Sequence, residues 1–459
     1  MIKESVAYSI GEFLFKGSRF LMIPFYVTFL PQEEYGILQQ IIILTSFSDV
    51  FVSLAVKQAM LRLYYDYKSE LEQLTFLGTI LSMLSGSYLI VWAIFTFTPM
   101  FTWIFDFPEL SSDFQLILLY SFLFELLHLS MNYFRIHRRL KSYMQISALV
   151  SFSEIGLILF MLLLNSNDAM VRIYGGTIAC SIGLVWILIS EKKLRIRPEW
   201  NWNIIRSYLK FSYPLISVGI LGWFLVSYDK MIIDNQFGTA NLAIYGLAFQ
   251  LASVYKFSQA GFLRAVSVNV YEKYDTAQFR KHAKRIGVVS AIIYASVGFC
   301  FLVLMYYVAP LFMPTHYAAA TDLTMLLIIS KILLLYYMYN TTILKSHKDT
   351  LSVLSIYILS SILFFFACRI LIPGYGLLGG VYANILSSFF MFSVGQIVVH
   401  FKYDFKLTGW EWIILGAIIL YAVFARVLAA TTFHAVTAAY TLVLVYLIWK
   451  KRELTPWKK

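Results

Sequence analysis

The chain has 459 residues, of which 60% are hydrophobic and only 14% are charged, and its mean hydropathy is +0.72. Soluble domains contain about 45–50% apolar and about 25% charged residues, so this composition excludes a soluble globular protein. The formal net charge of +12 does not indicate nucleic-acid binding. The cations lie in short clusters between apolar segments, which is the pattern that orients a membrane protein.

Apolar segments of membrane-spanning length, about 20 residues each, recur along the whole chain. We predict fourteen transmembrane helices, at 8–30, 36–58, 76–98, 114–134, 142–164, 173–190, 211–234, 243–263, 286–309, 323–344, 350–372, 379–400, 411–430 and 434–449. The first segment contains charged residues and is not followed by a small-residue cleavage site, so we expect it to remain as a helix. No loop exceeds about 22 residues, which leaves no room for a soluble catalytic domain.

Lysine and arginine fall almost entirely in alternate loops. The loops on the side of both termini hold 29 of these residues, whereas the loops on the other side hold only Arg172. Because positively charged loops stay on the cytoplasmic side, this asymmetry predicts a multi-pass protein whose two termini are both cytoplasmic.

The two halves of the chain share short matches at a nearly constant spacing. The matches are Glu34-Tyr35-Gly36 with Ile244-Tyr245-Gly246, Leu61-Arg62 with Leu263-Arg264, Asn132 with Asn340, and Gly175-Gly176 with Gly379-Gly380. Their constant order indicates a duplicated six-helix unit, inserted twice in the same direction as a parallel repeat. We therefore predict an all-α integral membrane protein with an N-terminal six-helix lobe over 1–200, a C-terminal six-helix lobe over 201–405, and an appended helix pair with a basic tail over 406–459.

Three charged residues share one face of the first predicted helix. Glu12, Lys16 and Arg19 are spaced at i, i+4 and i+7. A charge in the middle of the bilayer costs about 2.5–3.5 kcal/mol, so we expect this face to point to the interior or to a hydrated cavity. Glu12 and Lys16 can also form a purely structural pair. Arg19 has no partner four residues further on and is therefore the stronger candidate for a functional role.

Further charged residues lie inside the predicted helices of both halves. They are Asp49, Glu125, His128 and Glu154 in the first half and Asp229, Lys230, Lys256 and Lys331 in the second. These side chains either line a hydrated path or pair across helices and hold the bundle together. Near the predicted helix ends, Asp234, Arg369 and Arg426 can extend to the membrane interface. Glu125, His128 and Glu154 are candidates for a proton-coupling step.

Sequence signatures of enzyme chemistry do not occur. The chain contains no Walker loop, no G-x-S-x-G, no H-E-x-x-H and no acidic metal-binding cluster, so we predict a protein that is not an enzyme and that needs no metal or other cofactor. Cys180, Cys300 and Cys368 lie far apart in apolar segments, where we expect inert buried thiols. Pro214 falls in the first turn of its predicted helix, where proline is tolerated.

Several segments resemble the polysaccharide transporters of bacteria, which include the O-antigen flippases. These segments are Leu30-Pro31-Gln32-Glu33-Glu34-Tyr35-Gly36, Lys210-Phe211-Ser212-Tyr213-Pro214-Leu215-Ile216, Tyr228-Asp229-Lys230, and Phe237-Gly238-Thr239-Ala240-Asn241-Leu242-Ala243-Ile244-Tyr245-Gly246. The family belongs to the multidrug/oligosaccharidyl-lipid/polysaccharide exporter superfamily, whose members have 12 or 14 helices.

The resemblance implies a function. It implies two lobes around a central cavity that opens alternately to each side of the bacterial inner membrane. The implied substrate is an oligosaccharide linked to undecaprenyl pyrophosphate, for O-antigen, lipopolysaccharide or other surface polysaccharide synthesis. A polysaccharide polymerase and a chain-length regulator are implied partners. Among the charged residues that line such a cavity, the matches are Arg19, Asp229 and Lys230.

Other functions remain as alternatives. The first is a multidrug or cation antiporter of the same fold, which five interior cations against five interior acids neither favour nor exclude. A membrane glycosyltransferase or polymerase would need acidic motifs or a large extracytoplasmic loop, and a scaffold would leave the buried charges unexplained. We expect substrate contacts from Lys16, Arg19, Asp229, Lys230, Lys256 and Lys331. We expect ion coupling or structural pairing from Glu12, Asp49, Glu125, His128 and Glu154.

Overall fold

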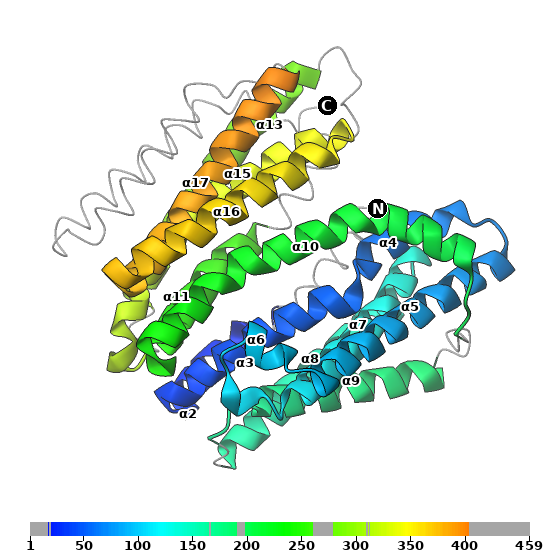
Figure 1. Ribbon diagram of the computed structural model, residues 1–459, viewed down its shortest axis with the longest axis horizontal. Coiled ribbons are helices and arrows are strands. Elements are labelled where there is room, and N and C mark those ends of the chain that lie inside the picture. Colours follow the sequence, from blue (N-terminus) through cyan, green and yellow to red (C-terminus); the bar gives the residue numbers. More distant parts are fainter. Residues whose placement is uncertain are drawn as a thin grey trace. The chain divides into compact units, whose positions relative to one another are not determined.

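The computed structural model describes residues 20–164, 167–190, 198–259, 279–308 and 313–403, together with Gly17 and Leu311. All regular structure within these residues is helical (Figure 1). The chain divides into two compact units, which are described separately. Unit 1 comprises Met1–Ser227 and Gly238–Ala243, and unit 2 comprises Tyr228–Phe237 and Ile244–Lys459.

Unit 1 is a bundle in which α3, α7, α8 and α9 form the main packing contacts. Its helices are α2 (Ile23–Phe29), α3 (Gln32–Ser53), α4 (Val56–Leu63), α5 (Glu70–Phe97), α6 (Met100–Ile104), α7 (Phe114–Ile136), α8 (Leu140–Leu163), α9 (Val171–Ser190) and the first part of α10 (Trp202–Phe237), with short 3-10 turns at Tyr64–Asp66 and Pro108–Leu110. A Cβ atom on Gly176 would lie 2.6 Å from the ring of Tyr120, so the glycine allows α9 to approach α7 closely.

The predicted helix over 36–58 is interrupted in the structure. Leu54 and Ala55 adopt left-handed backbone conformations, with φ of 44° and 61°, and separate α3 from α4. Such a break frees backbone carbonyls that must find donors inside a membrane. The hydroxyl of Ser87 donates to the carbonyl of Val52 at 2.7 Å, and the phenol of Tyr208 donates to that of Leu54 at 2.6 Å. These two side chains make the break tolerable.

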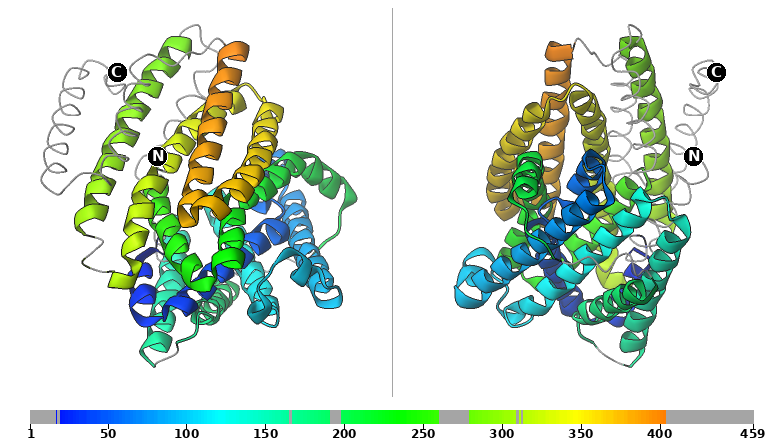
Figure 2. Two further views of the ribbon diagram at one scale, coloured as in Figure 1. Left: turned by 60° about the vertical axis from the view of Figure 1, so that its left-hand side comes forward. Right: turned by 90° about the vertical axis from the view of Figure 1, so that its right-hand side faces the viewer.

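Unit 2 is organised around one largely buried helix. It contains the end of α10, most of α11 (Thr239–Ser258), α13 (Phe279–Tyr307), a 3-10 turn at Thr315–Tyr317, α15 (Ala318–Ser346), α16 (Thr350–Tyr375) and α17 (Leu377–Tyr403). Helix α15 packs against α13, α16 and α17, which run beside it in the views of Figure 2. In the most apolar 18-residue stretch of this segment, 78% of the residues are buried within the protein.

Both units contain the same helix corner. Helix α7 leads into α8 through Arg138 at φ 53°, and α15 leads into α16 through Lys348 at φ 59°, 210 residues later. In each corner the next backbone amide donates to a carbonyl five residues earlier, from Arg139 to Phe134 at 2.8 Å and from Asp349 to Leu344 at 3.0 Å. This likeness of backbone geometry supports the repeat suggested by the short sequence matches.

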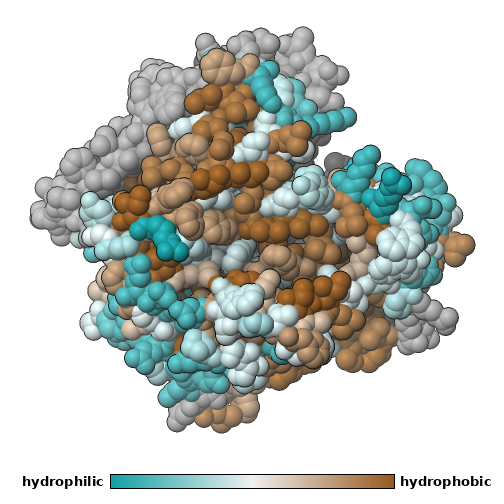
Figure 3. Space-filling model, viewed as in Figure 1, coloured by the Kyte–Doolittle hydropathy of each residue, from teal (hydrophilic) through white to brown (hydrophobic). Residues whose placement is uncertain are grey.

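Nine helices of the described residues are long and apolar enough to cross a membrane, and many of their large apolar side chains are exposed (Figure 3). The chain is therefore a multi-pass membrane protein. The predicted helices at 411–430 and 434–449, and most of the one at 8–30, lie outside the described residues. The expectation for Pro214 was wrong, because α10 begins at Trp202 and Pro214 lies within the helix and not in its first turn. The expectation of a buried thiol holds for Cys180 and Cys368 but was wrong for Cys300, which is exposed.

Candidate functional site

Asp229 is the centre of a polar cluster inside unit 2. Its side chain, on α10, is fully buried and accepts hydrogen bonds from three elements. The donors are the phenol of Tyr245 on α11, the side-chain amide of Asn384 on α17 at 2.7 Å, and the backbone amide of Lys230 at 2.9 Å. A buried carboxylate needs such partners, and these three hold it in one orientation.

The glycine pair at the start of α17 explains how Tyr245 reaches Asp229. A Cβ atom on Gly380 would lie 2.9 Å from the Tyr245 hydroxyl oxygen and 3.0 Å from its ring, so only glycine leaves this space open. One turn further along, the amide of Asn384 also donates to the Gly380 carbonyl at 3.0 Å. The absence of one side chain thus allows α11 and α17 to meet at the carboxylate.

The Lys230 ammonium group makes a long contact with Asp229 and lies close to the ring of Phe249. Its nitrogen lies 3.5 Å from the Asp229 carboxylate, which is long for a charge-assisted hydrogen bond. The same nitrogen lies 3.3 Å from the ring centre of Phe249 on α11. A desolvated cation over an aromatic face gains about 2 kcal/mol or more. The long contact with Asp229 leaves N–H groups of the ammonium able to donate to a phosphate oxygen.

Lys331 on α15 shares the Phe249 ring. Its ammonium nitrogen lies 3.6 Å from the ring centre, and the residue is 5% exposed. In the part of the chain that the structure describes, it forms no ion pair. Because both ammonium nitrogens lie close to the centre of the same ring, at 3.3 and 3.6 Å, the two groups are also close to each other. Lys256, half-buried on α11, lies within electrostatic range of Lys331.

These residues form what we call the lysine cluster: Lys230 and Lys331 at the ring of Phe249, Asp229 beside Lys230, and Lys256 near Lys331. Three cations against one carboxylate leave an excess of positive charge. Asp229 lies eight residues before the end of α10, and Lys331 lies 13 residues after the start of α15, which places them about 12 Å and about 20 Å along their spans. Charges at such depths are costly, and those that occur pair with other groups or contact an ion or a ligand.

The acidic candidates lie in unit 1. Glu125 on α7 is fully buried, Glu154 on α8 is 7% exposed, and Asp49 on α3 is half-buried. The ring of His128 is buried one turn from Glu125, with Nδ1 3.0 Å from the Phe124 carbonyl. Glu125 also lies within electrostatic range of the Tyr208 phenol, which caps the α3–α4 break. The acids therefore line the packed core of unit 1.

The structure extends and limits the sequence-based set of candidates. It brings Asp229, Lys230, Lys256 and Lys331 together, whereas Glu12, Lys16 and Arg19 lie outside the described residues. Sequence analysis missed the roles of Tyr245, Phe249 and Asn384. Tyr245 belongs to the repeated Tyr-Gly pair, and Asn384 follows the repeated glycine pair, so the repeat could have identified both. No sequence feature distinguished Phe249. Asp234, which we expected near the interface, is 8% exposed.

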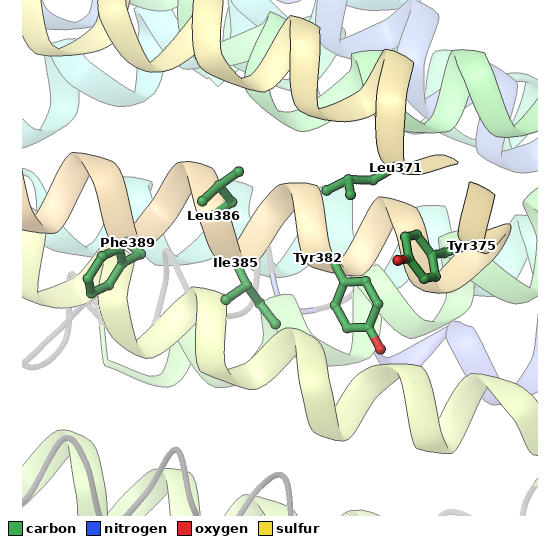
Figure 4. Close-up of a pocket in the computed structure, with 6 residues that line it drawn as sticks. All are labelled: Leu371, Tyr375, Tyr382, Ile385, Leu386 and Phe389. Carbon is green, nitrogen blue, oxygen red and sulfur yellow. The ribbon is translucent and has the colours of Figure 1, made fainter. Parts of the chain in front are cut away.

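A separate apolar groove of about 640 Å³ lies along α16 and α17. Its lining, shown in Figure 4, consists of Leu371, Tyr375, Tyr382, Ile385, Leu386 and Phe389. Tyr382 and Leu386 are 38% and 42% exposed, and helical geometry places them on the face of α17 opposite Asn384. The groove and the lysine cluster are therefore different features of unit 2.

Comparisons with solved structures identify the fold. Lipid II flippase MurJ in an inward closed conformation is 14% identical, with 98% of this chain and 99% of that chain covered and a TM-score of 0.69. A multidrug resistance MATE family transporter of the MOP superfamily, in an outward-facing conformation, is 14% identical over 91% of this chain and 96% of its own, with a TM-score of 0.58. A mutant of the Vibrio cholerae MATE transporter VcmN is 11% identical over 90% of this chain and 97% of its own, with a TM-score of 0.57.

No curated protein sequence matches the chain. The structural likeness at these low identities shows a shared fold, which is the helical transporter fold that the sequence resemblance implied. A family model described as "Polysaccharide biosynthesis protein" matches residues 27–322, which is more than half of the chain. The chain therefore belongs to this family of polysaccharide biosynthesis proteins.

Proposed function

We propose that the protein is a flippase that moves undecaprenyl-pyrophosphate-linked oligosaccharide units from the cytoplasmic to the periplasmic leaflet of a bacterial inner membrane. The product would serve O-antigen or another surface polysaccharide, with a polymerase and a chain-length regulator as partners. The family and the fold support a transporter of a lipid-linked saccharide. The observation that carries the proposal is the lysine cluster, an excess of cations inside spanning helices.

The contacts of the lysine cluster suit a pyrophosphate. Without substrate, the ring of Phe249 stabilises the buried ammonium groups of Lys230 and Lys331 by about 2 kcal/mol or more each. Each ammonium group has three N–H donors, and hydrogen bonds between charged groups contribute about 1.5–3 kcal/mol each, so two or three bonds to phosphate oxygens exceed the ring contact. Asp229 already accepts hydrogen bonds from Tyr245 and Asn384, and its contact with the Lys230 ammonium group is long at 3.5 Å.

The remaining parts of the mechanism follow from the sequence. We place both termini in the cytoplasm and assign Lys16 and Arg19 to the substrate path in an N-terminal lobe over 1–200. The C-terminal lobe over 201–405 supplies the lysine cluster, and 406–459 forms the appended helix pair. Alternating access of a cavity between the lobes would carry the sugars across while the lipid tail stays in the bilayer. Glu12, Asp49, Glu125, His128 and Glu154 remain candidates for ion coupling or pairing.

A multidrug or cation antiporter is the second candidate, because MATE transporters share the fold. The excess of cations in the lysine cluster opposes it, since a cationic substrate would be repelled there.

Deletion of the gene provides the test. We expect lipid-linked saccharide units to accumulate on the cytoplasmic side and surface polysaccharide to be lost. Wild-type protein should restore both, and so should the control Lys141→Gln, which removes an exposed lysine at the start of α8. The double variant Lys230→Gln/Lys331→Gln should restore neither although it reaches the membrane. Unchanged surface polysaccharide after deletion would refute the proposal.

A further inference from the structure

Arg369 is a cation inside a spanning helix that the proposed function does not use. It lies on α16, six residues before the helix ends at Tyr375, and its side chain is exposed. Its Nε–H group donates to the phenol oxygen of Tyr228 at 3.0 Å. Tyr228 belongs to the end of α10, next to Asp229, so Arg369 is fixed to a second helix of unit 2.

The guanidinium group of Arg369 points away from the nearer end of its helix. Its central carbon lies 5.5 Å from the ring centre of Phe365, one turn toward the start of α16. Side chains on helices lean in this direction. Arg369 itself lies about 9 Å below the last residue of α16, and its guanidinium group extends from there toward the Phe365 ring, away from that end. The expectation that Arg369 extends to the nearby interface is not what the structure shows.

Neutral groups surround Arg369 in the described part of the chain. The rings of Tyr228 and Phe365 stack on each other, with centres 5.3 Å apart and planes at 21°, and support the guanidinium group from one side. Among the described residues Arg369 forms no ion pair, in contrast to Lys230, which has Asp229. Arginine has five N–H donors, and Tyr228 accepts from one. An unpaired charge in a span costs about 2.5–3.5 kcal/mol, which an anion bound to the remaining donors would offset.

We propose that Arg369, Tyr228 and Phe365 form a second anion site, for the phosphate group of a lipid. The planar fork of a guanidinium group matches two phosphate oxygens. The site lies within a spanning segment and is exposed, so the phosphate must be attached to an apolar chain that enters the membrane. The headgroup of a bilayer phospholipid and the phosphate of a prenyl-linked molecule share this chemistry. The site does not depend on the transport proposed above.

Binding to the full chain in detergent tests the site, with bound molecules counted by native mass spectrometry. The probes are phosphatidylglycerol and, separately, farnesyl diphosphate. We expect Arg369→Gln to weaken binding at this site about tenfold, because the charged hydrogen bonds are lost. The control is Arg62→Gln, which removes an arginine from an exposed pair with Asp66 at 2.9 Å and should change nothing.

The two probes distinguish the sources. A loss confined to phosphatidylglycerol supports a phospholipid headgroup, a loss confined to farnesyl diphosphate supports a prenyl-linked phosphate, and a loss of both supports a site open to either. No loss, or an equal loss in Arg62→Gln, overturns the proposal. If Arg369→Gln does not fold, Arg369→Lys and Tyr228→Phe replace it. Both should bind several-fold more weakly, because one lacks the planar fork and the other the phenol oxygen, and unchanged binding in both overturns the site.

Discussion

The two units have similar backbones and different buried charges. The corner at Arg138 in unit 1 recurs at Lys348 in unit 2, and each unit has a glycine in close contact with a tyrosine ring, at Gly176 on α9 and at Gly380 on α17. The buried Asp, Glu, His and Lys side chains do not recur. In the described part of unit 1 they are the acids Glu125 and Glu154 with His128, whereas unit 2 has Lys230 and Lys331 with the acids Asp229 and Asp234.

This difference separates what the fold requires from what the function requires. Corners and glycine contacts set the path and spacing of the helices, so both units keep them. Buried charges destabilise a membrane bundle and are retained only for a purpose. We infer a division of roles in which the cations of unit 2 hold an anionic group and the acids of unit 1 respond to a coupling ion.

The largest expected effect separates the two roles directly. Lys331→Gln should weaken binding of a prenyl diphosphate by about 10- to 100-fold, because a charge-assisted contact to phosphate is lost. Glu125→Gln should leave that binding within about twofold and should instead remove the dependence of transport on pH, because its carboxyl can no longer exchange a proton. Binding is measured on the purified protein, and transport in vesicles over a range of external pH.

The control for this contrast is Lys141→Gln, which removes an exposed lysine from unit 1 and should leave both measurements unchanged. The division of roles fails if Glu125→Gln weakens binding as much as Lys331→Gln does. It also fails if transport by Glu125→Gln keeps the pH profile of the wild type.

A smaller effect is expected from Phe249, which positions the cations of unit 2. Phe249→Leu keeps an apolar side chain but removes the ring beneath both ammonium groups, and should raise the KM for transport about three- to tenfold. Phe249→Tyr keeps the ring and should stay close to wild type. If both variants only lower thermal stability and leave KM unchanged, Phe249 is a packing residue.

Much of the fold follows from the sequence because apolar length dominates in a membrane. The segment predicted at 142–164 is α8, at Leu140–Leu163, and the one at 350–372 is α16, at Thr350–Tyr375. The break at Leu54 and Ala55 was not predictable, since neither residue favours a left-handed backbone and the compensating donors come from other helices. The helix start at Trp202 was missed because its first turns are polar and extend beyond the apolar segment.

Only the charged residues of the candidate site were predictable from the sequence. Asp229, Lys230 and Lys331 were identifiable as charges within apolar segments. Phe249 was not, since a phenylalanine in a spanning helix is ordinary and its role depends on two lysines from other parts of the chain. Arg369 was misjudged because distance to the helix end was considered without the lean of the side chain toward Phe365.

The smallest expected effect is on the free energy of unfolding, and it concerns the matching corners α7–α8 and α15–α16. Asp349 follows the corner of unit 2 and accepts hydrogen bonds from the Ser352 amide at 3.1 Å, the Ser352 hydroxyl at 2.8 Å and Lys402 at 2.8 Å. Arg139 occupies the matching position in unit 1 and provides no side-chain cap. Asp349→Ala should therefore lower the free energy of unfolding by about 1 kcal/mol through loss of the helix cap, whereas Arg139→Ala removes no such cap.

The pH dependence of this difference identifies the carboxylate as its cause. Partial burial alone would raise the pKa of Asp349, but the hydrogen bonds from Lys402 and Ser352 prevail and lower it to about 2. A lowered pKa in the folded state means that the stabilisation is complete above the unfolded value of about 3.9 and is lost as the pH falls toward 2. The gap in melting temperature between wild type and Asp349→Ala should accordingly be constant from pH 7 to about pH 5 and shrink below pH 4. A gap that persists at pH 2 would mean that packing of the side chain, and not its charge, distinguishes the two corners.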